Sequence, residues 1–318
     1  MTHPAFLSIP STGFWVGKFE TGYNGANGTT EAEQNVHDSS KIIVKPNVYS
    51  WRGIQVANAF YTSYDYQRDL DSHMMKNTEW GAVAYLQHSV YGSATSVRLN
   101  NNSDYITGYQ ANNEPSCVYT DINEECNICC NDGTRNTAYP NGLLASTTAN
   151  ISGIFDMSGG AFEYVMGVML DENGNPISGL NSMSNSRFNG TFGCPTCSED
   201  DSGLTECTDG YDLPARIYYD TYLYSNKTTV YSRVEYKNRI LGDATGEMGS
   251  FFSLIYNNSK RNIGSWYNDN AYFLNSYTPW FLRGGVAKHG TDAGMFSFEY
   301  HYGVENVTGT FRIVLSPI

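Results

Sequence analysis

The sequence has few charged residues. Lysine, arginine, aspartate and glutamate make up 16% of its 318 residues, and 32 acidic residues outnumber 19 basic ones, for a formal net charge of −13. It contains no basic run or stripe of the kind that binds nucleic acids or anionic membranes. We therefore expect neither a nucleic acid nor an anionic membrane surface as a partner.

Long apolar runs are also missing. No segment approaches the ~20 consecutive apolar residues of a membrane-spanning helix, so we expect no membrane insertion. The opening segment, MTHPAFLSIPSTGFWVGK, has neither a basic start nor an uninterrupted apolar stretch, and it does not match a secretory signal peptide. We therefore expect a chain that is cytoplasmic, trimmed, or released by another route such as lysis; of these locations, the resemblance described below favours one outside the cell.

The short motifs of common active sites are absent from the sequence. It contains no Gly-x-Ser-x-Gly nucleophile elbow, no His-Glu-x-x-His zinc motif, no phosphate-binding loop and no dinucleotide-binding fingerprint. Local motifs therefore give no support for catalysis.

Tyrosine and glycine, by contrast, are abundant. The chain contains 25 tyrosines and 31 glycines, together with many asparagines and serines. This composition is typical of binding loops, because tyrosine offers a large contact area at a low entropic cost while the small polar residues adapt their hydrogen bonds. Since 40% of the residues are hydrophobic, the chain also has ample material for a core.

The apolar patterns predict an α+β fold. A helical spacing of apolar residues covers 54–66, and a second helix begins at Asn77 or Thr78 with Glu79 in its first turn. Alternating or continuous apolar runs predict strands in the segments GFWVGKFETG, AFEYVMGVML, WFLRGGV, GMFSFEY and GTFRIVL.

Between these elements lie polar segments rich in asparagine and glycine. We predict a flexible insertion from Gly22 to about Ser40, and two longer, cysteine-bearing insertions at about 92–149 and 181–214. We interpret the whole chain, residues 1–318, as one domain that carries these insertions.

All seven cysteines lie in the two longer insertions. Cys126 with Cys129, and Cys194 with Cys197, have the Cys-x-x-Cys spacing, and two such pairs can hold one tetrahedral zinc ion. Disulfides between the insertions fit an extracellular protein equally well. In either case the role is structural, because a segment with few apolar residues needs a cross-link to stay ordered. We expect no other cofactor.

The stretch NISGIFDMSGGAFEYVMG is interpreted as a rigid scaffold. Gly159 and Gly160 predict a tight turn with positive φ. Asp156 and Glu163 are its only charged residues, and neither a nucleophile nor a metal ligand is nearby in the sequence. We expect Asp156 to accept backbone hydrogen bonds and Glu163 to pair with an arginine such as Arg283, because buried charges are seldom unpaired.

Three segments, NTEWGAVAYL, ISGIFDMSGGAFEYVMG and WFLRGGV with the terminal GTFRIVL, together resemble the formylglycine-generating-enzyme branch of the C-type lectin fold. Their order and spacing also fit that branch. The resemblance implies a C-type lectin fold outside the insertions. Gly160 departs from the family pattern, which has asparagine at that position.

The branch contains both enzymes and binding proteins. Its formylglycine-generating oxidases hold copper with a C-terminal pair of cysteines, and this sequence has no cysteine after Cys207. The stretch WFLRGGVAKHGTDAGMFSFEYHYGVENVTGTFRIVL more closely resembles the variable proteins of diversity-generating retroelements, which occur on phage tails and bacterial surfaces. The resemblance therefore implies a binding protein and not an enzyme.

The implied binding surface lies in the C-terminal region, about 280–316, between residues that resemble the fixed framework of the family. A protein or glycan receptor on a target cell would contact it, and display on a virion or bacterial surface suggests a homotrimer or a larger assembly. A structural or decorating protein without a ligand is the first alternative, and an oxidase of the formylglycine-generating type is the second. The candidate ligand-binding residues are Trp280, Lys288, His289, Asp292, Ser297, Glu299, Tyr300, His301, Tyr302, Glu305 and Asn306.

Overall fold

A computed structural model describes fourteen separate parts of the chain: residues 3–7, 9–10, 12–28, 30–45, 48–92, 146–148, 152–171, 173–174, 192, 213–223, 240–245, 271–274, 278–286 and 294–316. Most of both cysteine-bearing insertions, including Cys126, Cys129, Cys194 and Cys197, lies outside these residues. The helices and strands of the described parts are β1 (Trp15–Val16), β2 (Gly22–Tyr23), β3 (Ile42–Ile43), α1 (Val56–Tyr64), β4 (His73–Met74), α2 (Asn77–Ala84), β5 (Phe162–Leu170), β6 (Asp220–Leu223), β7 (Trp280–Arg283), β8 (Phe298–His301), β9 (Gly309–Phe311) and β10 (Ile313–Leu315).

The mixed content of helices and sheets confirms the predicted α+β class. Both predicted helices are present, and both bury apolar residues against the sheet. The sequence predicts Asn77 or Thr78 as the N-cap of α2, which is one or two residues too late, because Lys76 is the N-cap and Asn77 is already helical. Glu79 lies in the first turn as predicted, where its carboxylate accepts a hydrogen bond from the Lys76 backbone N–H at 2.8 Å.

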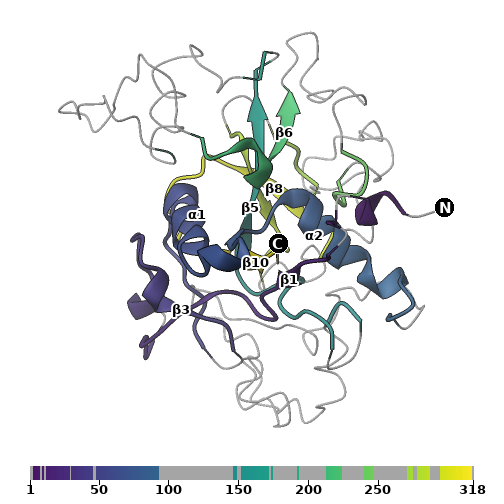
Figure 1. Cartoon of the computed structure of the whole chain (residues 1–318). Helices are drawn as coiled ribbons and strands as arrows, with labels where there is room; N and C mark the ends of the chain where they lie inside the picture. Colours follow the sequence, from purple (N-terminus) through teal and green to yellow (C-terminus); the bar gives the residue numbers. More distant parts are fainter. Residues whose placement is uncertain are drawn as a thin grey trace, which may run out of the picture.

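The largest sheet is built around β5. Its strand order is β6-β5-β7-β8, and β9 also pairs with β5. All nine residues of β5 are buried, which explains its continuous apolar sequence, because both faces of the strand are covered. Figure 1 shows α1 and α2 on the two sides of β5. Side chains of β5 accordingly alternate between the core beside α2, which contains Val165 and Met169, and the core beside α1, which contains Met166 and Val168.

A second sheet pairs strands from opposite halves of the chain. Strand β10 lies between β1 and β4 and is antiparallel to both. The C-terminal end is accordingly near β1 and β10 in Figure 1. This pairing joins residues about 300 positions apart in the sequence, Trp15 and Leu315, so the second sheet depends on the fold of the whole domain.

The prediction of a flexible insertion from Gly22 to Ser40 is wrong where the structure pairs this segment. Strand β2, at its start, is antiparallel to β3, which follows its end. In the segment between these two strands, the carbonyl of Gln34 accepts a 2.7 Å hydrogen bond from the indole N–H of Trp51, and Ala32 is fully buried. A polar sequence can be ordered in this way because its backbone groups find partners on neighbouring segments.

One residue of the second cysteine-bearing insertion belongs to the core. Phe192 is fully buried, and its ring lies 5.9 Å from that of Phe60 in α1 and 5.5 Å from that of Trp280 in β7, measured between ring centroids. This residue follows no periodic pattern, so sequence reasoning missed it. It lies two residues before Cys194 in the sequence.

Candidate binding surface

The structure places two predicted ligand-binding residues inside the protein. Trp280 and Ser297 have no exposed surface, so their assignment to a binding surface is wrong. Trp280 opens β7 and packs in the core beside Phe192, while Ser297 lies between two buried phenylalanines. The backbone carbonyl of Ser297 accepts a hydrogen bond from Gly284 N–H at 3.3 Å. The predicted residues Lys288, His289 and Asp292 lie outside the described residues.

Strand β8 divides three more predicted residues between its two faces. Tyr300 is 38% exposed, and its ring contacts that of Tyr272 at a centroid distance of 5.7 Å. Glu299 and His301 belong to the opposite face, because side chains alternate along a strand. The three residues therefore do not form the single surface that the sequence suggested.

The segment after β8, Tyr302–Thr308, is the clearest candidate for a display site, and we call it the display loop. Its backbone is fixed by groups that come from elsewhere in the chain. Carbonyl oxygens of the loop accept hydrogen bonds of 2.8–2.9 Å from five such donors: Gly303 from Val56 N–H, Val304 from the Tyr164 hydroxyl, Asn306 from Gly53 N–H, Val307 from the Arg52 guanidinium, and Thr308 from Phe162 N–H.

Two predicted ligand-binding residues support this loop from within. The Oδ1 atom of Asn306 accepts hydrogen bonds from the backbone N–H of Thr308 at 3.0 Å and from its hydroxyl at 2.8 Å. The Nδ1 atom of His301 accepts one from Gly303 N–H at 3.2 Å and lies 2.5 Å from the Tyr164 hydroxyl oxygen. Burial lowers the pKa of His301 to about 4, so the ring is neutral near pH 7. Both residues thus hold the loop in shape.

The remaining side chains of the display loop reach the solvent. Glu305 is exposed, Val307 is 51% exposed, and Tyr302 and Val304 are half-buried. The carboxylate of Glu305 accepts a hydrogen bond from the side-chain amide of Asn35 at 3.2 Å. The loop therefore combines a fixed backbone with exposed polar, aromatic and aliphatic side chains.

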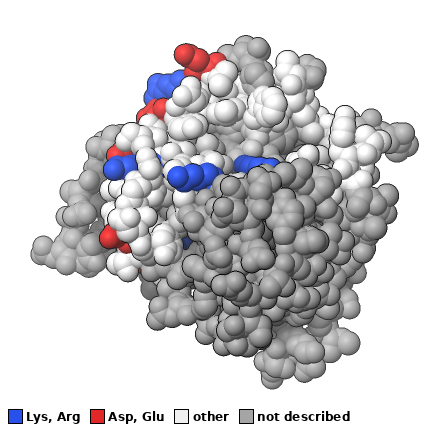
Figure 2. Space-filling model, turned by 90° about the horizontal axis from the view of Figure 1, so that it is seen from below, with Lys and Arg blue, Asp and Glu red and all other residues white. Residues whose placement is uncertain are grey.

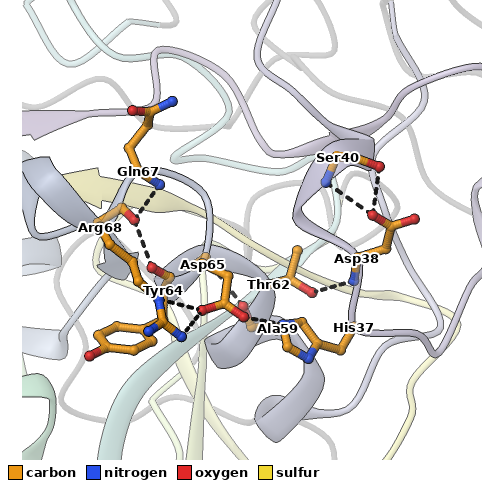
Figure 3. A network of polar contacts seen from close by, with 11 residues as sticks. His37, Asp38, Ser40, Ala59, Thr62, Tyr64, Asp65, Gln67 and Arg68 are labelled. Carbon is orange, nitrogen blue, oxygen red and sulfur yellow. Dashed lines mark hydrogen bonds and ion pairs between the residues drawn. The ribbon is translucent and has the colours of Figure 1, made fainter.

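The surface continues from the loop onto α1. The side-chain amide of Asn58 donates to Oδ1 of Asn35 at 2.9 Å, so the 35–38 segment lies along the helix. Figure 3 shows the polar contacts at the C-terminal end of α1. The carboxylate of Asp65 contacts both His37, with 2.8 Å between Nε2 and Oδ2, and the guanidinium of Arg68. Arg68 also stacks on the ring of Tyr64, at 4.7 Å from its centroid. These contacts satisfy Asp65 and fix the end of the helix.

Beneath the loop, Glu163 pairs with Arg312 and not with Arg283 as predicted. The Nε of Arg312 donates to Glu163 at 2.9 Å, a second donor from the same guanidinium completes a two-point contact, and both side chains are fully buried. Arg312 also donates to the carbonyls of Gly17 and Phe155 at 2.7 and 2.9 Å. The expected arginine partner is therefore present, but it is not Arg283. Glu163 and Arg283 are neighbours across the sheet, although their side chains have different partners.

Arg283 instead joins a buried polar network. Its guanidinium donates to the side chain of Asn77 at 3.0 Å and to the carbonyl of Asp243 at 3.2 Å, and it lies 5.4 Å from the ring of Trp80. The hydroxyl of Tyr222 donates to the carboxylate of the same Asp243 at 2.5 Å. This network joins β7, α2 and β6, which supports a structural role for Arg283.

The scaffold features predicted for residues 150–167 are confirmed at three positions. Gly159 and Gly160 have φ values of 83° and 73°, and the carboxylate of Asp156 accepts a hydrogen bond from Glu20 N–H at 3.3 Å. Burial and the charges of Asp156 and Glu163 raise the pKa of Glu20 well above its usual value. This concentration of buried carboxyl groups was not expected, because Glu20 is distant in the sequence.

Within the described residues, no group of three or more histidine, cysteine, aspartate or glutamate side chains is arranged to hold a metal ion, and no helix is long and apolar enough to cross a membrane. On the face shown in Figure 2, acidic and basic side chains of those residues are scattered among neutral ones.

Neither a scan against protein-family models nor a search of curated proteins gives a match for this chain.

Proposed function

We propose that this chain is a binding protein whose exposed display-loop side chains contact a receptor. The observation that carries the proposal is the separation of roles within the loop. Five backbone carbonyls are held by donors from the rest of the domain, while Glu305 and Val307 are exposed. A preformed loop loses little conformational entropy when it binds, so more of the contact energy is available for affinity.

The proposal also includes a C-type lectin fold of the formylglycine-generating-enzyme branch. Three features support it: the ordered sequence segments that resemble this branch, the α+β architecture, and the pairing of β1 near the start of the chain with β10 near its end. The same branch suggests the class of binding protein, namely a variable protein of a diversity-generating retroelement.

We infer the biological setting from that resemblance. The receptor would be a protein or a glycan on a target cell, and the chain would be displayed outside the cell, on a phage tail or a bacterial surface. Attachment to a cell requires binding affinity and no catalytic activity. The exposed side chains of the display loop, Glu305 and Val307, are available to contact a receptor. The display loop would be the part of the molecule that faces the target.

A cell-attachment assay tests the proposal. The fluorescently labelled chain would be incubated with a panel of bacterial strains and compared with a variant that carries Tyr302→Ser, Glu305→Ser and Val307→Ser. We expect the natural chain to label a subset of strains and the variant to lose this labelling. Glu305 and Val307 are exposed, so their substitutions cost about 0.5 kcal/mol or less each, and the half-buried Tyr302 adds about 1 kcal/mol. The melting temperature should therefore fall by no more than about 3 °C.

The control replaces exposed aliphatic residues elsewhere on the molecule with serine. Leu7, Val90 and Leu241 are 71%, 92% and 62% exposed, so the triple serine variant removes a similar amount of exposed surface. It should label the same strains as the natural chain. If the loop variant still labels them, or if both variants lose labelling equally, the display loop is not the binding site.

A further inference from the structure

A buried pair of ionisable side chains lies where β4 meets α2, away from the display loop. The side chains of His73, in β4, and Glu79, in the first turn of α2, are 3% and 4% exposed. The Nε2 atom of His73 lies 3.1 Å from Oε1 of Glu79. The other ring nitrogen, Nδ1, lies 2.7 Å from the backbone carbonyl oxygen of Asp71.

The partners of this ring determine its protonation. A backbone carbonyl can only accept a hydrogen bond, so Nδ1 must carry a proton. In a neutral ring, Nε2 would then present a lone pair to a carboxylate oxygen, which is also an acceptor. One further proton must therefore lie between Nε2 and Glu79 for the observed contact to be attractive.

Other charged and titratable groups surround the pair on each packed element. At the N-cap of α2, the Lys76 ammonium lies 3.4 Å from Oε1 of Glu79. From β6, the carboxylate of Asp220 accepts a hydrogen bond from Thr78 N–H at 2.7 Å. From the 216–218 turn, the ring of Tyr218 lies 5.6 Å from that of His73. Two carboxylates therefore meet the first turn of α2, and the imidazolium offsets part of their charge.

We propose that His73 and Glu79 form a pH-sensitive latch, closed by one proton, that fastens the first turn of α2 to strand β4. Loss of the proton places a lone pair against a buried carboxylate, so the contact turns from attractive to repulsive. The turn that it releases contains the backbone N–H groups that Glu79 and Asp220 cap.

The direction of the pH effect follows from the pKa values. Burial opposes the charged imidazolium of His73, but the Glu79 carboxylate outweighs it and raises its pKa above 6.5. A raised folded-state pKa gives stability that is complete below pH 6.5 and is lost as the pH rises through that higher value. Burial also raises the pKa of Asp220 to about 6, so its contribution declines in the same direction. The latch is thus closed below pH 6.5 and opens as the pH rises through the raised pKa of His73.

Substituting Glu79→Gln tests the latch. The glutamine amide can donate to the lone pair of a neutral His73, and its oxygen can still accept the Lys76 N–H, so the contact no longer needs an extra proton. Urea denaturation of the natural chain should show a roughly tenfold rise in the unfolding equilibrium constant from pH 6 to pH 8, the scale of one charged hydrogen bond. In the variant most of this rise should disappear.

The control is His37→Gln, which changes the exposed histidine paired with Asp65 and should keep the full pH dependence. An NMR titration of the His73 ring in the natural chain measures the pKa of that ring directly. This measurement tests the latch even if the Glu79→Gln variant does not fold. A ring that titrates above pH 6.5 supports the latch. A ring that titrates at or below 6.5, or an undiminished pH dependence in Glu79→Gln, would overturn it.

Discussion

The hydroxyl of Tyr164 offers the sharpest test of how the display loop is held. It donates a 2.8 Å hydrogen bond to the carbonyl of Val304 and lies against the ring of His301. Substituting Tyr164→Phe removes this single donor and keeps the fully buried ring in place. We expect the sheet to stay intact and the loop to open more often.

The size of the effect follows from the loss of one buried hydrogen bond. Leaving the Val304 carbonyl without its donor costs about 2 kcal/mol, within the range for buried polar groups that lose a partner. For a chain of 318 residues, this corresponds to a drop of about 3 °C in melting temperature. If the cost falls on local opening, the backbone N–H groups of Gly303, Thr308 and Gly309 should exchange roughly 30-fold faster.

Hydrogen exchange measured by mass spectrometry on peptides that cover 300–311 would follow this change. Tyr222→Phe is the matched control, because Tyr222 is another fully buried tyrosine whose hydroxyl donates to Asp243. It should lower the melting temperature without selective exchange in the loop. If both variants speed loop exchange equally, or if Tyr164→Phe leaves it unchanged, the loop is not held through this hydroxyl.

Two further predictions concern buried charge. Substituting Arg312→Met should lower the free energy of unfolding, measured by urea denaturation, by about 3–5 kcal/mol, because Glu163 is left buried without its partner. Adding Glu163→Leu should restore part of this loss. A double variant less stable than the single one would contradict the prediction. His301 should have the opposite pH dependence to the His73–Glu79 latch, because its pKa in the folded protein, about 4, lies below 6.5. The stability that it contributes is present above pH 6.5 and is lost as the pH falls toward 4. The total loss is about 3 kcal/mol. Loop exchange, corrected for intrinsic rates, should therefore rise on acidification, and His301→Asn should weaken this rise.

Local patterns accounted for the helices and the main strands. The helical spacing from Ile54 to Tyr64 predicts α1 because one face of that segment must be buried, and the continuous apolar run in β5 predicts a strand covered on both faces. The glycine pair at 159 and 160 likewise has the positive φ values that its sequence indicated. These features depend on residues within one turn or one strand of each other.

The sequence by itself therefore determined the α+β class, the positions of the helices and the turn at Gly159, since each follows from local spacing. Only the tertiary structure decided that Arg312 and not Arg283 neutralises Glu163, that Trp280 and Ser297 are buried, and that His301 supports the display loop. Those outcomes depend on which strands pair and which side chains meet across the core. A sequence pattern shows which polar and charged residues need a hydrogen-bonding or ionic partner. Packing between segments far apart in the chain determines which residue that partner is.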